Sequence, residues 1–103
     1  FYVTEIHNGD TINIRQVDFT DIGAKKFTAT VAAEIEGAAI EVHLYSEIGP
    51  LLGTLKIKPT GALDKWESQS IDIQNTKETH DLVFKFTGPA NKPLLNFDTW
   101  QFE

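Results

Sequence analysis

The side chains that could do chemistry are concentrated near the end of the chain, between Leu94 and Glu103. The aromatic and aliphatic residues of this segment are typical of a strand, but Asn96 and Asp98 interrupt them. A polar group inside an apolar strand costs folding free energy unless it finds a partner. Asn96 and Asp98 are therefore candidates for a role in binding. The segment also contains Trp100, so we expect it to belong to the core of the fold rather than to a frayed tail.

Trp66 is the next candidate, because it directly follows the loop at 62–65, where a strand is expected to begin. Tryptophan is usually mostly buried, so one interpretation is that its ring caps the core. The other is that the ring is a flat platform for a sugar, whose C–H face packs on an aromatic while amides bind its hydroxyl groups. Asn91 and Asn96 could supply such amides. The residues alone leave both interpretations open.

The carboxylate of Asp98 also has two interpretations. It could bond to backbone groups or to a lysine, or it could bind a hard cation such as calcium, which prefers oxygen ligands. The histidines indicate less, because His7, His43 and His80 lack the i, i+4 spacing of a zinc-protease helix. Solvated histidines on strands are the better interpretation of these three residues.

Catalytic signatures are scarce in this sequence. The serines lack the G-x-S-x-G pattern of a nucleophile elbow, and the absence of cysteine excludes a catalytic thiol. Fifteen acidic residues can be paired in many ways, so no single pair indicates a glycoside hydrolase. A small enzyme is therefore the least favoured class of function.

The composition is that of one globular domain. A chain of 103 residues can form a single core, and 41% hydrophobic with 23% charged residues is ordinary for a soluble protein. The net charge of −6 would repel nucleic acids and anionic membranes, so we expect neither as a partner. No apolar run approaches the roughly 20 residues of a membrane span. Because position 1 is not methionine, we expect the chain to be a piece of a longer polypeptide.

Alternation of apolar and polar residues predicts strands along the whole chain. The eight expected strands are residues 2–7, 10–19, 25–34, 38–47, 51–58, 66–73, 81–86 and 94–103. Asn8-Gly9 is a two-residue turn signal and predicts that the first two strands form an antiparallel hairpin. Without a convincing amphipathic helix, this pattern predicts an all-β sandwich or barrel.

Six segments carry a resemblance to a known family: IHNGDTINIRQVDF, GAKKFTATVA, IEVHLYSEIGPLLGTLKI, PTGALDKW, HDLVFKF and LLNFDTWQFE. In this order they resemble the successive motifs of family 6 carbohydrate-binding modules. The closing N-F-D-x-W-x-F pattern and the upstream H-D-L-x-x-x-F pattern are fairly specific as a set. The most similar subgroup is attached to xylan- and arabinoxylan-degrading glycoside hydrolases, notably those of family 43. The resemblance implies a single module over residues 1–103, an antiparallel β-sandwich of the jelly-roll type.

The resemblance also implies where a sugar would bind. Modules of this family hold a sugar in a cleft among the loops at one edge of the sandwich, between two aromatic rings with an asparagine beneath. Trp66 matches one of these aromatics, and Asn96 matches the asparagine. The position of the second aromatic is Glu5 in this chain, although Tyr2 could approach from the neighbouring strand. Asn91 remains a further candidate for bonding the sugar.

Two other expectations come from the resemblance. Asp98 matches a carboxylate of the family's structural calcium site, whose other ligands lie on an N-terminal strand. We expect this chain to lack that strand, since the matching motifs begin only near its first residues. Some modules of the family also bind ligands on the concave face of a sheet, where Glu41 and Tyr45 would lie here.

The function implied is that of a non-catalytic module that binds polysaccharide or oligosaccharide outside the cell. Its partner would be the catalytic domain of an attached glycoside hydrolase, held on xylan or arabinoxylan. The alternative is a structural β-sandwich in which Glu5 indicates a degenerate cleft and the module only braces a neighbouring catalytic domain.

Overall fold

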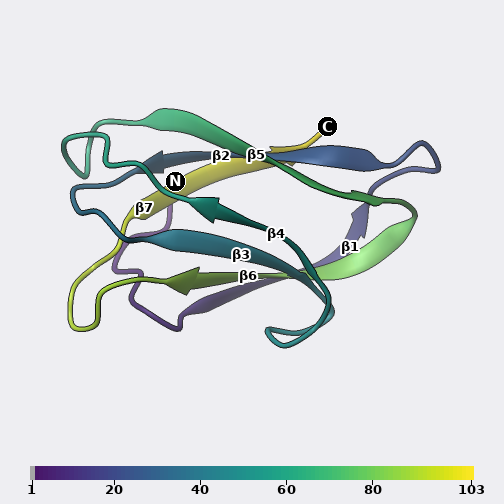
Figure 1. Cartoon of the computed structure of the whole chain (residues 1–103), viewed down its shortest axis with the longest axis horizontal. Coiled ribbons are helices and arrows are strands. Elements are labelled where there is room, and N and C mark those ends of the chain that lie inside the picture. Colours follow the sequence, from purple (N-terminus) through teal and green to yellow (C-terminus); the bar gives the residue numbers. More distant parts are fainter. Residues whose placement is uncertain (1) are drawn as a thin grey trace.

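Alternating apolar and polar residues form two facing antiparallel sheets in the computed structural model, which describes residues 2–103 (Figure 1). The first sheet has the order β1-β6-β3-β4 and the second the order β5-β2-β7. The seven strands of the described residues are β1 (Thr11–Asp18), β2 (Ala24–Ala32), β3 (Ala39–Leu44), β4 (Leu51–Lys56), β5 (Glu67–Thr76), β6 (Thr79–Thr87) and β7 (Asn96–Phe102). This architecture confirms the predicted antiparallel β-sandwich. No helix in the described part of the chain is long and apolar enough to cross a membrane.

The core lies between the two sheets and follows from the period of two along each strand. Phe27 of β2 and Phe84 of β6 are fully buried, and their ring centroids lie 5.3 Å apart across the sandwich. Phe84 also meets Phe97 of β7 at 5.7 Å. Burial of each such side chain contributes about 1.5–3 kcal/mol to the free energy of unfolding. The final strand thus packs into the core, as predicted, although it is an edge strand of its sheet.

The turn at Asn8-Gly9 forms, but the predicted hairpin does not. The Asp10 backbone N–H donates to the His7 carbonyl oxygen at 3.0 Å, and Gly9 has the positive φ of 91° that this turn requires. However, the residues before the turn do not pair with β1, which instead pairs with β6. The prediction of a first hairpin was therefore wrong.

The expected first strand, residues 2–7, is reduced to a single antiparallel bridge between Val3 and Phe97 (Figure 1). The pairing of β1 with β6 explains this outcome, because it places Ile12 opposite Phe84 and Ile14 opposite Leu82 and so extends the apolar layer of the first sheet. A turn signal fixes where the chain reverses, but burial decides which strands become neighbours.

A bulge in β7 explains the polar residues that interrupt this strand. Opposite Thr30 of β2 the register shifts by one residue, so Asp98 and Thr99 together occupy the place of one. Both are exposed, whereas Phe97 before them and Trp100 after them pack on the core. Asp98 is therefore an outward-facing residue that needs no buried partner.

Candidate functional site

The loop that presents Trp66 lies between β4 and β5 and is held at two points. The Thr60 backbone N–H donates to the Ala33 carbonyl oxygen at 2.8 Å, and the Ala33 N–H donates to Thr60 Oγ1 at 3.0 Å. Further along the loop, Asn96 Nδ2 donates to the Leu63 carbonyl oxygen at 2.8 Å. The loop thereby presents Trp66 with 36% of its surface exposed. Trp66 is thus not a buried cap on the core, which was one of its two interpretations.

Tyr2 is the aromatic residue that meets Trp66. Their ring centroids are 4.9 Å apart and the ring planes lie at 73°, an edge-to-face contact. Tyr2 is held there by the Val3–Phe97 bridge, in which each backbone N–H donates to the other's carbonyl oxygen at 2.8 and 3.0 Å. The two rings form a corner, and both remain partly exposed, since half of the Tyr2 surface is exposed as well.

Asn96 lies on the same side of β7 as Tyr2. In an antiparallel bridge, the residues next to the bridged pair point away from the face that the pair occupies. Tyr2, next to Val3, and Asn96, next to Phe97, therefore share one side. Asn96 is 9% exposed, and its Nδ2 braces the Trp66 loop. Among the described residues its Oδ1 has no partner and is not sealed from solvent, which leaves this oxygen available to accept a hydrogen bond.

The remaining predicted sugar-binding residues are not joined to Trp66. Glu5 is exposed with a positive φ of 57°, and its carbonyl oxygen lies 3.0 Å from His7 Nδ1. Asn91 is exposed in the turn between β6 and β7 and has a φ of 63°. In residues 2–103, no hydrogen bond or aromatic contact connects either residue to Trp66. The aromatic partner is Tyr2, which the sequence offered only as a ring that could approach in place of an aromatic at position 5.

A second concave surface lies over β1, β6 and the loop between β3 and β4. It has a volume of about 450 Å³, and Thr11, Arg15, Tyr45 and Asp81 are among its lining residues. Tyr45 is 60% exposed, and its hydroxyl group lies 2.8 Å from His80 Nδ1. Tyr45 therefore lines a concave surface beside the first sheet, and a second sugar site at this surface stays a prediction.

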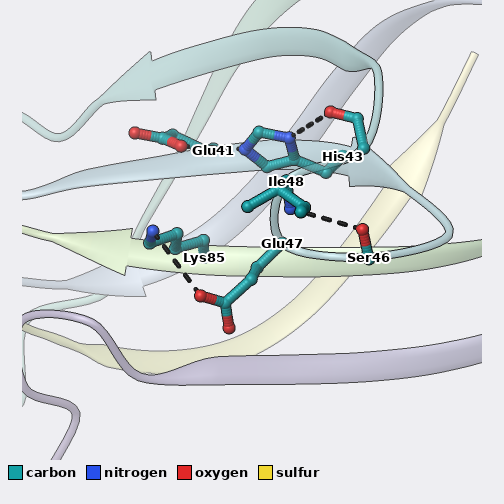
Figure 2. A network of polar contacts seen from close by, with 7 residues as sticks. Glu41, His43, Ser46, Glu47, Ile48 and Lys85 are labelled. Atoms are coloured by element: carbon teal, nitrogen blue, oxygen red, sulfur yellow. Dashed lines mark hydrogen bonds and ion pairs between the residues drawn. The ribbon is translucent and has the colours of Figure 1, made fainter.

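Glu41, the other residue expected at that surface, faces a different partner (Figure 2). Its Oε1 lies 2.8 Å from His43 Nε2, and His43 Nδ1 lies 2.9 Å from the Gly49 carbonyl oxygen. His43 is buried, so its contact with the Gly49 carbonyl oxygen fixes the loop between β3 and β4 to the sheet. Beside it, Glu47 and Lys85 form an ion pair at 3.8 Å. Glu41 thus stabilises a loop and does not line the second surface.

Asp98, the predicted calcium ligand, lies exposed in the β7 bulge. Residues 2–103 contain no group of three His, Cys, Asp or Glu side chains that could hold a metal ion. By themselves the described residues do not supply the carboxylate cluster that calcium favours. Calcium binding at Asp98 stays a prediction.

A sequence profile described as carbohydrate binding module (family 6) matches residues 2–103. The chain belongs to carbohydrate-binding module family 6. It is 46% identical over 100 residues to an arabinoxylan arabinofuranohydrolase of Paenibacillus polymyxa. The matching region covers 97% of this chain but only 16% of that enzyme. Members of the family bind carbohydrate and are not catalytic, so the chain is a binding module rather than an enzyme. The family and the lack of catalytic activity were predicted from the sequence and are confirmed.

Two solved structures of family 6 modules are similar over nearly the whole chain. CsCBM6-3 of Clostridium stercorarium in complex with cellobiose is 35% identical, with a TM-score of 0.89 over 99% of this chain and 72% of that one. A family 6 module of Clostridium cellulolyticum in complex with xylose is 30% identical, with a TM-score of 0.92 over 99% of this chain and 78% of that one. Both were determined with sugar ligands.

Proposed function

We propose that this module binds xylan-type polysaccharide at the corner formed by Trp66 and Tyr2, and so holds an attached glycoside hydrolase on its substrate. The observation that carries the proposal is the exposed Trp66 ring on a braced loop, next to a second ring and an available amide oxygen. The similar C. cellulolyticum module was determined with xylose, and the similar P. polymyxa enzyme is named for arabinoxylan. A polymeric substrate of this kind implies that the module acts outside the cell.

The chemistry of such a site would divide between the rings and Asn96. The C–H face of a xylose ring packs on an indole face, and this contact excludes water from both surfaces. Because the Tyr2 ring stands at 73° to Trp66, it contacts the edge of a sugar rather than its opposite face. Asn96 Oδ1 accepts a hydrogen bond from a sugar hydroxyl group. The corner therefore suits a sugar that is stacked on one side, with the other side open to solvent or to further substituents.

Replacing Trp66 by alanine tests this proposal directly. We expect the variant to bind arabinoxylan about 10- to 100-fold more weakly, since the burial of a large apolar side chain contributes about 1.5–3 kcal/mol. Affinity gel electrophoresis in arabinoxylan, xylan, β-glucan and agarose measures the effect. The matched control is Trp100→Phe, which alters the other tryptophan at the rim of the core and should keep full affinity.

The edge contact of Tyr2 with Trp66 also favours a second candidate function. It covers part of the platform, as expected of a degenerate cleft in a module that only braces a catalytic domain. Such a brace binds none of the four polysaccharides, and Trp66→Ala then changes nothing. If any one gel retards the wild-type chain and does not retard Trp66→Ala, the hypothesis that the module is only a brace is wrong.

A further inference from the structure

Two lysines project from the end of β4, which is an edge strand of its sheet. Lys56 and Lys58 are exposed and alternate with Leu55 and Ile57, which are buried, so both lysines point away from the core. The whole chain carries a net charge of −6. A pair of cations on one short segment is therefore a local feature and not a general property of the surface.

A groove lies on each side of these lysines. The first, of about 440 Å³, runs between the end of β4 and β5, and Ser68 and Ser70 line it. The second, of about 500 Å³, lies between β4 and the connection of β2 to β3, around Ala38. Lys56 and Lys58 line both grooves. A ligand in either groove therefore lies against the same two lysines.

The wall between β4 and β5 is fixed by one side chain. Gln69 Nε2 donates to the Lys58 carbonyl oxygen at 2.8 Å, and Gln69 Oε1 accepts from the Lys58 backbone N–H at 2.9 Å. This amide pairs with the backbone as a neighbouring strand would, so it closes the edge at Lys58. The Lys58 side chain therefore starts from a rigid point in the groove.

The first groove reaches the start of β5, the strand that directly follows Trp66 in the chain. Glu67 and Ser68 line it, and both directly follow Trp66 in the chain. We propose that this groove extends the sugar site, and that Lys56 and Lys58 bind carboxylate groups carried by the polysaccharide. The inference rests on the proposed function, and it names a further class of ligand, a xylan chain with uronic acid substituents.

The charges around the groove fit such a ligand. Within residues 2–103 neither Lys56 nor Lys58 forms an ion pair, so both ammonium groups are available. Glu67 is the carboxylate that lines the first groove, near Trp66, and Glu36 lines the second. Each repels a ligand carboxylate at its own end, which favours a position over the two lysines. The hydroxyl groups of the serines can bond to uncharged parts of the sugar chain.

Binding to glucuronoxylan and to neutral arabinoxylan, compared by affinity gel electrophoresis, tests the inference. At about 0.01 M salt we expect the wild-type chain to prefer glucuronoxylan by about 2- to 30-fold, the range that two exposed ion pairs provide. At about 1 M salt the preference should vanish, because charges are screened within about 3 Å. The double variant Lys56→Gln/Lys58→Gln should lose the preference at low salt and keep its binding to arabinoxylan.

The matched control is Lys25→Gln/Lys26→Gln, which removes the same charge from two exposed lysines of β2 that line neither groove. Equal loss of preference in both double variants, or none in Lys56→Gln/Lys58→Gln, overturns the inference. Self-association of Lys56→Gln/Lys58→Gln with unchanged preference also overturns it, since the lysines would then only protect an edge strand. If free glucuronate displaces the module from glucuronoxylan but the module does not prefer glucuronoxylan to arabinoxylan, the groove does not extend the sugar site. If the wild-type chain binds neither polymer, the proposed function fails as well.

Discussion

At the scale of single residues, the site depends on how Tyr2 reaches Trp66. Family resemblance pointed to position 5 for the second aromatic, and this chain has Glu5 there. The Val3–Phe97 bridge instead fixes the backbone beside Tyr2, so that a residue three positions earlier provides the ring. The edge-to-face geometry of this pair contributes about 0.5–1.5 kcal/mol beyond the burial of area. A contact of this strength orients the two rings, which both remain partly exposed.

Tyr2→Ala should therefore weaken the binding of arabinoxylan and also lower the stability of the fold, by a similar free energy. We expect a 3- to 10-fold loss of affinity for arabinoxylan, consistent with about 0.7–1.4 kcal/mol for one edge contact. The free energy of unfolding should fall by about 0.5–1.5 kcal/mol, because the variant also loses the edge-to-face contact with Trp66. Isothermal titration with xylo-oligosaccharides and urea unfolding measure the two effects. Tyr2→Phe and Glu5→Ala are the controls, and an affinity loss in Glu5→Ala equal to that in Tyr2→Ala would refute the assignment.

At the scale of elements, loops at the ends of the sandwich are held by buried side chains. His43 anchors the loop between β3 and β4 through the Gly49 carbonyl oxygen (Figure 2). Asn96 anchors the Trp66 loop through the Leu63 carbonyl oxygen. His43 was predicted to be a solvated histidine and Asn96 a sugar-binding residue. Both contact the backbone of a loop. Such anchors explain how exposed loops keep one conformation without a core of their own.

Gly49→Ala tests how tightly the first of these loops is held. A Cβ at position 49 would overlap the Leu44 carbonyl oxygen, so the loop has to move and the contact with His43 is lost. We expect a loss of about 1–3 kcal/mol in the free energy of unfolding, comparable to other overpacked sites. Urea unfolding followed by circular dichroism measures it. Ser46→Ala, in the same loop, should cost under about 0.5 kcal/mol, since its Oγ accepts only one long bond from Ile48. If Gly49→Ala lowered the free energy of unfolding as little as Ser46→Ala, the loop would tolerate displacement and the prediction would be wrong.

At the scale of the whole molecule, the strand content was predictable and the pairing of strands was not. Period-two alternation is a local property, so strands such as β3 with buried Ile40 and Val42 were located from the sequence. The pairs β1–β6 and β2–β7 join distant segments, and no local signal specifies them. The bulge at Asp98 was missed for the same reason, because it is defined only by the register against Thr30. Trp66 and Asn96 were candidates from their positions in the sequence and also matched family motifs, whereas Tyr2 was named only as a ring that could approach, because its contact depends on the bridge.

Because both sheets share one core and their pairs are non-local, the module should unfold as one cooperative unit. The two tryptophans report on different regions, since Trp66 lies on the loop of the proposed sugar site and Trp100 packs against Phe84 at 5.4 Å. In the variants Trp66→Phe and Trp100→Phe, a single tryptophan reports each region by fluorescence during urea unfolding. We expect each fluorescence transition to coincide with the far-UV circular dichroism of the same variant. If the Trp66 transition precedes the circular dichroism transition of its variant and the Trp100 transition does not, the loop that carries Trp66 melts before the sandwich. Refolding should take milliseconds to seconds, as is usual for sandwiches whose strands pair over long sequence separations.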